Sequence, residues 1–255
     1  SLLKEYPHIE LHISEFEILF NKAWFFRSMG KLDESLDCLN NLLSMSSYEA
    51  FTRYDVQALH VDVLLKLSMV DKAYQAVTEV KNSHQFEYLH ATDQAHWKIL
   101  SGYVYLASIL VYQKVGDDPF QIFNKKNALL VLELECRPIM KDKLGYNLRF
   151  IVLKLLLLII QSNYKLDWDA SFVTTYVHRY VSKSPEKRTL HFLRIFMKVV
   201  GLHLGDSINQ HTKKLYKKID KHEKYAYDIC ELLPYPFIIK ILLALAEQSK
   251  RGAAN

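Results

Sequence analysis

The stretch AWFFRSMGKLDESLDCLNNLL, residues 23–43, decides the fold, because it holds two helical patterns separated by one glycine. On both sides of Gly30, apolar residues recur every three or four positions, as they do in amphipathic helices. Gly30 stands where a helix C-terminal cap favours glycine, and Asp33, Glu34 and Asp37 complement the dipole of the second helix. We therefore predict helices over about residues 13–29 and 32–43, packed antiparallel because the link is so short.

The same arrangement recurs along the chain. Apolar periodicity predicts a helix over about residues 48–67 and a shorter one carrying Ala73, Val77 and Val80. Aligning Ser35 with Ala73 aligns the patterns of the two hairpins. The number of residues from Ser35 to Ala73 is here called the repeat length, and it is typical of helical repeats. A third long helix is predicted over residues 92–114, followed by a partner helix over residues 120–134.

Beyond Pro138 the pattern is less regular. Residues 146–161 are apolar almost all round, which predicts a helix buried between neighbours on several sides. The apolar run within it, residues 150–160, contains Lys154 and is too short to cross a membrane. Further helices are expected over about residues 170–181, 186–204, 206–227 and 237–248.

Glycine and proline are scarce, with 7 and 6 in 255 residues, and short β-strands need turn residues at shorter intervals. Half of the residues are hydrophobic and 24% are charged, a balance typical of globular proteins. We therefore predict an all-α protein, with stacked antiparallel hairpins over residues 1–137. An irregular helical bundle over residues 138–255 is expected to pack on them as one elongated unit.

Charge is distributed unevenly along the chain. Residues 1–128 contain 12 Lys and Arg against 16 Asp and Glu, and residues 129–255 contain 21 against 12. A basic C-terminal half suits an acidic partner or nucleic acid, but a solvated surface is the interpretation we favour. The three widely spaced cysteines indicate no disulfide framework, and the first residues do not resemble a signal peptide. These features predict a cytoplasmic protein.

Residues 13–114 resemble tetratricopeptide repeats. Ala23 and Ser35 stand at positions where small side chains let two helices approach, Phe26 at the aromatic position and Gly30 at the turn. Ser47 stands where the family usually has a proline. The other matching residues are Leu39 and Leu42 in the first hairpin, Val61, Leu64, Ser68, Ala73, Val77 and Val80 in the second, and Trp97, Leu100, Ser101 and Val104 in the third.

Residues 141–147, with the apolar helix that follows them, are also similar to uncharacterised helical-repeat proteins of Bacteroidetes bacteria. That resemblance brings no known function.

The tetratricopeptide resemblance implies an α-solenoid in which the first helix of each hairpin lines a concave groove for extended or helical peptides. A Trp beside an Arg would suit an anchor pocket in that groove. The alternative for Trp24, packing between hairpins as core, stays open. The groove residues implied position by position are Glu17, Trp24, Arg27, Asp62, Lys98 and Tyr105.

Candidate metal and catalytic residues form no convincing constellation. His8 and His12 are one helical turn apart, but Glu10 is not placed as in a zinc protease and no third ligand can be named. The sequence contains no glycine-rich phosphate loop and no nucleophile elbow. We therefore expect no metal, no cofactor and no catalytic residue. The remaining histidines in regular patterns, for which surface positions are expected, are His84, His90, His96, His191 and His203.

A basic cluster lies on one face of the helix expected over residues 206–227, with Leu215 and Ile219 on another face. Such a face could contact phosphates, although a solvated amphipathic face is the interpretation we favour. Its members are Lys214, Lys217, Lys218 and Lys221.

The leading functional hypothesis is a non-enzymatic helical-repeat module, or scaffold, that binds a protein or peptide partner. The alternative is a sensor or regulatory domain of a bacterial transcription regulator whose DNA-binding part is absent from this chain. Direct nucleic-acid binding by the basic half comes third, and an enzyme is least favoured. The sequence indicates no membrane partner and does not indicate an oligomeric state.

Overall fold

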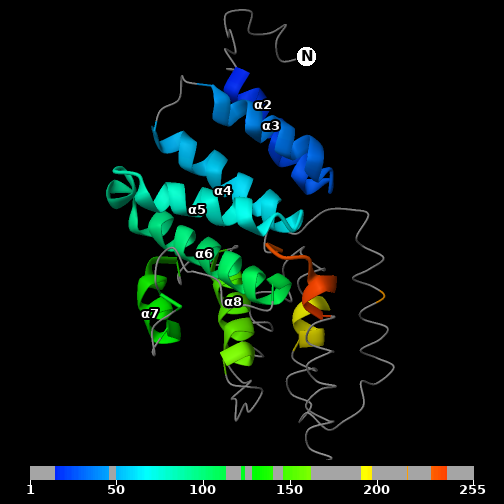
Figure 1. Cartoon of the computed structure of the whole chain (residues 1–255), viewed down its shortest axis with the longest axis vertical. Coiled ribbons are helices and arrows are strands. Elements are labelled where there is room, and N and C mark those ends of the chain that lie inside the picture. The colour runs from blue at the N-terminus through cyan, green and yellow to red at the C-terminus, as the bar shows by residue number, and fades with distance from the viewer. Residues whose placement is uncertain are drawn as a thin grey trace, which may run out of the picture.

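The computed structural model describes residues 15–45, 50–112, 122–123, 128–139, 146–161, 191–196, 217 and 231–239. Nearly all of them are helical and none forms a strand, which confirms the all-α class (Figure 1). No described helix is both long and apolar enough to cross a bilayer. The elements are α2 (Glu15–Ser28), α3 (Leu32–Ser44), α4 (Ala50–Lys66), α5 (Val70–Asn82), η1 (Phe86–Tyr88), α6 (Ala91–Tyr112), α7 (Ala128–Glu135), η2 (Arg137–Ile139) and α8 (Tyr146–Gln161).

In the first hairpin, α2 and α3 meet through two small residues. Ala23 and Ser35 are both fully buried, and the Ser35 hydroxyl donates a hydrogen bond to the Ala23 carbonyl at 2.7 Å. The hairpin turns at Gly30, whose φ is 75°. The Gly30 N–H donates to the Arg27 carbonyl and the Lys31 N–H to the Phe26 carbonyl, so the last carbonyls of α2 are satisfied in a Schellman motif.

The second hairpin repeats this turn one repeat length further along the chain. Ser68, with φ at 59°, takes the place of Gly30, and its N–H donates to the Leu65 carbonyl. The Met69 N–H donates to the Leu64 carbonyl, the counterpart of the second bond in the first turn. The φ and ψ angles are −84° and 71° at Lys31 and −86° and 62° at Met69. The spacing found in the sequence is therefore a repeat of one backbone geometry.

Helices α2 to α6 pack against one another in chain order, and α6 then packs against α8 (Figure 1). The first helices of the hairpins also contact each other directly, α2 with α4 and α4 with α6. These contacts bring residues that are one repeat length apart in the sequence onto neighbouring helices.

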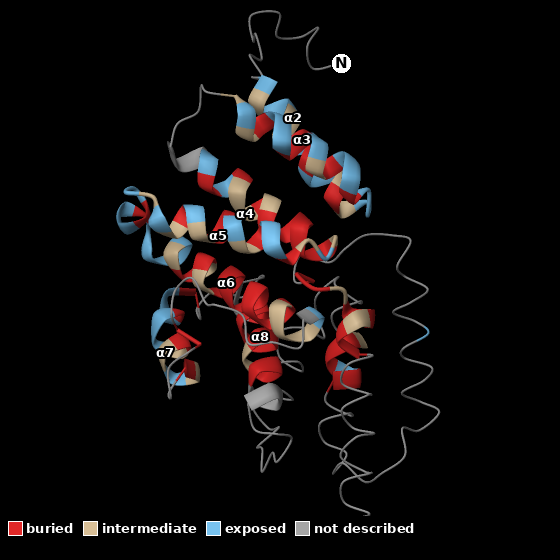
Figure 2. Ribbon diagram, viewed as in Figure 1, coloured by how far each residue is buried: buried red, intermediate tan, exposed pale blue. Residues whose placement is uncertain are grey.

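Two hydrophobic cores meet at α4. Val56, Leu59 and Val63 of α4 pack into a smaller core with α2 and α3. Val61 and Leu64 belong to a larger core that continues through α8 to residue 239 (Figure 2). The larger core thus contains residues on both sides of the boundary expected at residues 137 and 138.

Helix α8 is buried around its circumference over residues 148–157, as its sequence predicts. Every residue from 148 to 157 is buried except Lys154, which is half-buried and forms an ion pair with Glu133 of α7. A Cβ atom added at Gly102 of α6 would overlap Leu153 Cδ2 and lie 2.9 Å from Phe123 Cζ. The absence of a side chain at Gly102 therefore lets α6 and α8 approach closely.

Two expectations need correction. The helix expected over residues 120–134 is described from Ala128 to Glu135, whereas Ile122 and Phe123, which it was expected to contain, are buried and non-helical. The Phe123 ring stacks on Tyr105, with ring centroids 5.1 Å apart, and this tertiary contact accounts for its burial. The short helix η1 has no counterpart in the prediction. Most of the helices expected after residue 161 lie outside the described residues.

Candidate functional site

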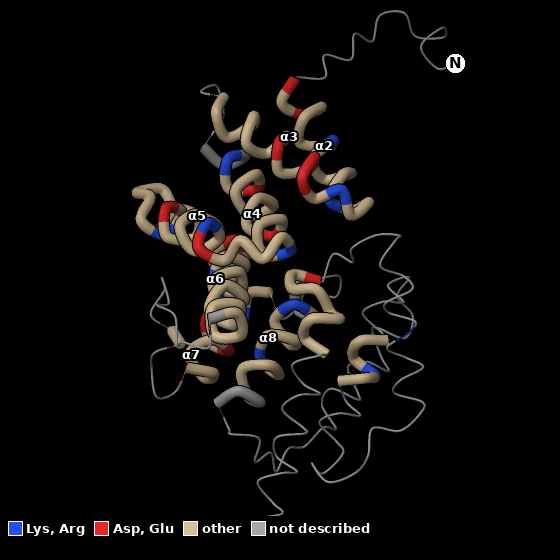
Figure 3. Tube along the Cα trace, turned by 45° about the vertical axis from the view of Figure 1, so that its right-hand side comes forward, with Lys and Arg blue, Asp and Glu red and all other residues tan. Residues whose placement is uncertain are grey.

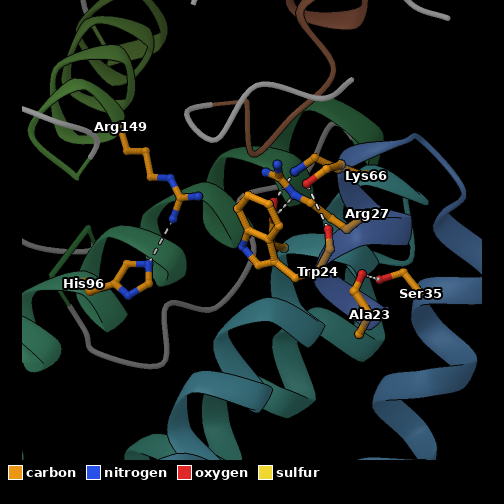
Figure 4. A network of polar contacts seen from close by, with 9 residues as sticks. Ala23, Trp24, Arg27, Ser35, Lys66, His96 and Arg149 are labelled. Carbon is orange, nitrogen blue, oxygen red and sulfur yellow. Dashed lines mark hydrogen bonds and ion pairs between the residues drawn. The ribbon is translucent and has the colours of Figure 1, made fainter. Parts of the chain in front are cut away.

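The most unusual polar feature is a buried charge network at the C-terminal ends of α2 and α4, made of Arg27, Asp62 and Lys66. The Arg27 guanidinium Nε donates to Asp62 Oδ2 at 2.7 Å, and Lys66 Nζ contacts Asp62 Oδ1 (Figure 4). Exposed fractions are 2% for Arg27, 3% for Asp62 and 5% for Lys66. Because buried charges are tolerated only when paired, this network joins α2 firmly to α4.

Two of these three residues are cationic and one is anionic. Their charges and their burial change the pKa values of Asp62 and Lys66. Burial opposes ionisation of Asp62, but the charges of Arg27, Lys66 and Arg149 outweigh it and lower the pKa of this carboxyl. Burial lowers the pKa of Lys66 to about 7, although the Asp62 charge opposes the change. Lys66 therefore titrates near neutral pH, whereas Asp62 stays ionised.

His96 of α6 and Arg149 of α8 form a second polar pair near this network. Burial and the Arg149 charge lower the pKa of His96 to about 3, so its imidazole is neutral. Arg149 Nη1 lies 3.1 Å from His96 Nε2, and because a guanidinium can only donate, Nε2 accepts. The Arg149 carbonyl accepts a hydrogen bond from the Tyr103 hydroxyl at 3.0 Å. These contacts hold α6 and α8 together.

Trp24 stands one turn before Arg27 on α2, and its side chain is 47% exposed (Figure 4). The helix turns the neighbouring Ala23 and Arg27 inward, so the indole is left at the surface. Ile18, Phe25 and Met29 are also exposed on α2 or directly after it. Exposed apolar side chains gathered on one element are typical of binding surfaces.

The six predicted groove residues are placed very differently from one another. Arg27 and Asp62 come together, but as the buried ion pair. Tyr105 is buried against Phe123, and Lys98 forms an ion pair with Glu135 of α7. Their role in binding stays a prediction. The two members that face solvent are Glu17 and Trp24.

Some of the other candidate residues lie within the described part of the chain and the rest lie outside it. Within the described part of the chain, no group of His, Cys, Asp and Glu could hold a metal ion. His84 and His90 are exposed, His96 takes part in the pair with Arg149, and His191 is partly buried. Of the basic cluster, Lys217 is described and exposed. The candidates outside the described residues are His8, His12, His203, Lys214, Lys218 and Lys221.

Sequence reasoning missed Lys66 and Arg149 as partners of Asp62 and His96. One signal was present, because Asp62 and Lys66 are four residues apart and therefore neighbours on one helix face. Nothing local showed that this face is buried. The pairing of Asp62 with Arg27 joins residues 35 positions apart and depends on the packing of α2 against α4.

Comparisons of this chain with protein-family models, with curated proteins and with solved structures found no match.

Proposed function

We propose that this chain is a non-enzymatic helical-repeat module that binds a protein or peptide across the first helices of its hairpins. The exposure of Trp24 carries the proposal. A large aromatic side chain at the surface gives up much water-accessible apolar area on binding, and tryptophan is enriched among residues that dominate binding energy.

The surroundings of Trp24 support this role. The buried Arg27–Asp62 pair joins the turn of α2 that carries Trp24 to α4, which restricts the orientation of this turn in the folded chain. A binding residue held in place loses less conformational freedom when its partner arrives. The repeated hairpin turn and the direct contacts of α2 with α4 and of α4 with α6 support a tetratricopeptide-like arrangement of the first helices.

The test starts from a random peptide library displayed on phage and selected against the purified chain. Selected peptides are then synthesised and titrated against the wild type and Trp24→Ala. The matched control is Tyr88→Ala, which removes an aromatic side chain that is 71% exposed on η1. Arg27 is unsuitable as a probe, because removing it would leave the Asp62 network incomplete.

We expect Trp24→Ala to weaken binding by about 2 kcal/mol, or about thirtyfold, as loss of an aromatic anchor does. Circular dichroism should show an unchanged fold, because the side chain is largely exposed. Tyr88→Ala should bind like the wild type. Equal affinities for the wild type and Trp24→Ala would exclude this surface as the site, and a library that yields no binder would exclude peptide binding itself.

A further inference from the structure

Three hairpin positions on the face that carries Trp24 are acidic, and they are spaced by the repeat. Glu17 lies on α2, Asp55 on α4 and Asp93 on α6, and each is one repeat length from the next. All three residues are exposed, although the carboxyl group of Asp55 is partly buried. Since α4 contacts both α2 and α6, these carboxylates stand at the equivalent position of three neighbouring helices, here called the acidic row.

Two members of this row, Asp55 and Asp93, stand on helices that contact each other. Partial burial, and then the charge of Asp93, raise the pKa of Asp55, and the second of these causes is a repulsion between like charges. A cation placed between them would relieve this repulsion, whereas an anion would increase it.

Trp24 belongs to the same face as the acidic row. It follows Glu17 by seven residues, which is close to two full turns, so both side chains project in nearly the same direction. Charged residues are spread along these helices (Figure 3), and the exposed cations of α2 and α4 stand at other helical positions than the acidic row. Lys22 lies over the Phe26 ring at 5.6 Å, and Arg53, two positions before the carboxylate on α4, points to the opposite side of that helix.

We propose that the face formed by Glu17, Trp24, Asp55 and Asp93 binds a basic segment of a partner protein, with one apolar side chain of that segment on the Trp24 indole. This inference rests on the proposed function and adds the chemistry of the partner. Charge complementarity selects the partner and speeds its approach, while the aromatic contact provides the apolar burial. The carboxylates disfavour acidic segments and phosphate-bearing ligands.

The experiment measures fluorescence anisotropy with three pools of short labelled peptides. All pools contain Leu and Phe, and they differ in carrying Lys and Arg, Asp and Glu, or Ser and Gln. Each pool is titrated against the wild type, Trp24→Ala and the triple variant Glu17→Gln, Asp55→Asn, Asp93→Asn. The control triple variant Asp37→Asn, Glu79→Gln, Glu87→Gln makes the same change in net charge at exposed positions on α3, α5 and η1.

We expect the basic pool to bind, and its affinity to fall about tenfold in the first triple variant and little in the control. Raising the salt concentration should weaken wild-type binding, because exposed charges are screened. The salt dependence is measured on the wild type alone, so it tests the charge pairing without relying on a variant. The first triple variant should fold normally, since neutralising Asp55 and Asp93 removes a repulsion.

Four results would overturn the inference. Equal losses in both triple variants would show a response to net charge rather than to this face. Salt-independent binding of the basic pool would exclude the charge pairing. If the acidic or neutral pool binds and its binding depends on Trp24, the proposed peptide-binding function is supported and the basic partner is excluded. If no pool binds and the phage library also yields no binder, both proposals are excluded.

Discussion

Gly30 and Ser68 occupy the same left-handed position in two turns of almost identical geometry. Glycine adopts this conformation freely, whereas a residue with a Cβ atom is strained there by about 1 kcal/mol. We predict that Ser68→Gly raises the free energy of unfolding by about 0.5–1 kcal/mol and that Gly30→Ala lowers it by about 1 kcal/mol. Urea denaturation measures both changes. A loss of stability in Ser68→Gly would contradict the prediction.

The buried network gives the chain a defined pH dependence. The folded-state pKa of Asp62 lies below its ordinary value, so its contribution is complete above about pH 4 and is lost as the pH falls through the folded-state pKa. The pKa of Lys66 is lowered from 10.5 to about 7. Between about pH 7 and pH 10.5 an unfolded chain keeps a proton on Lys66 that the folded chain has released, so Lys66 contributes a rise of stability with pH in that window.

We expect this rise to amount to at most about 1.4 kcal/mol per pH unit in the wild type and to be absent in Lys66→Met. Asp62→Asn should cost about 3–5 kcal/mol at neutral pH, because it removes the buried carboxylate that pairs with Arg27 and Lys66. Urea unfolding at a series of pH values measures both effects. Parallel pH profiles for the wild type and Lys66→Met would refute the assignment to Lys66.

Between elements, the close approach of α6 and α8 depends on Gly102. Alanine there gains about 1 kcal/mol of helix propensity but forces Leu153 and Phe123 to move within a packed core, at a cost of about 1–3 kcal/mol. We therefore predict that Gly102→Ala lowers stability. In a Leu153→Ala background the overlap with Leu153 disappears and the close contact with Phe123 remains, so Gly102→Ala should cost less stability there. Thermal unfolding of the four variants in a double-mutant cycle measures this coupling.

Most elements could be predicted from the sequence, because their patterns are local. Residues 146–161 are apolar all round and form the enclosed helix α8, as expected. The non-helical conformation of Ile122 and Phe123 could not be predicted, because apolar residues fit a helical period equally well and the contact of Phe123 with Tyr105 is not local in the sequence. Local pattern also could not show that Arg27 is buried while Trp24 is exposed, since that outcome depends on Asp62 in the next hairpin.

Across the whole molecule, the two hydrophobic cores differ in how many residues their helices bury. Helix α2 buries only Ala23 and Arg27, whereas α6 and α8 bury most of their described residues. Elements with few buried apolar contacts open at lower free energy. We predict that backbone amides of α2 and α3 exchange hydrogen faster than those of α6 and α8, as measured by hydrogen–deuterium exchange with mass spectrometry. Equal protection throughout would mean that the two cores unfold together.

The agreement of the two hairpin turns makes the chain a candidate for lengthening. The backbone enters α3 at Lys31 and α5 at Met69 with nearly the same φ and ψ angles. The C-caps Met45 and Ser83, again one repeat length apart, are similarly alike and close onto equivalent carbonyls in the last turns of α3 and α5. A duplicate of the segment from Lys31 to Ser68 could therefore be spliced in at Met69 without a new kind of joint. Proteins with one, two or three such inserts would form a series in which the length of the helical array increases by one hairpin per copy.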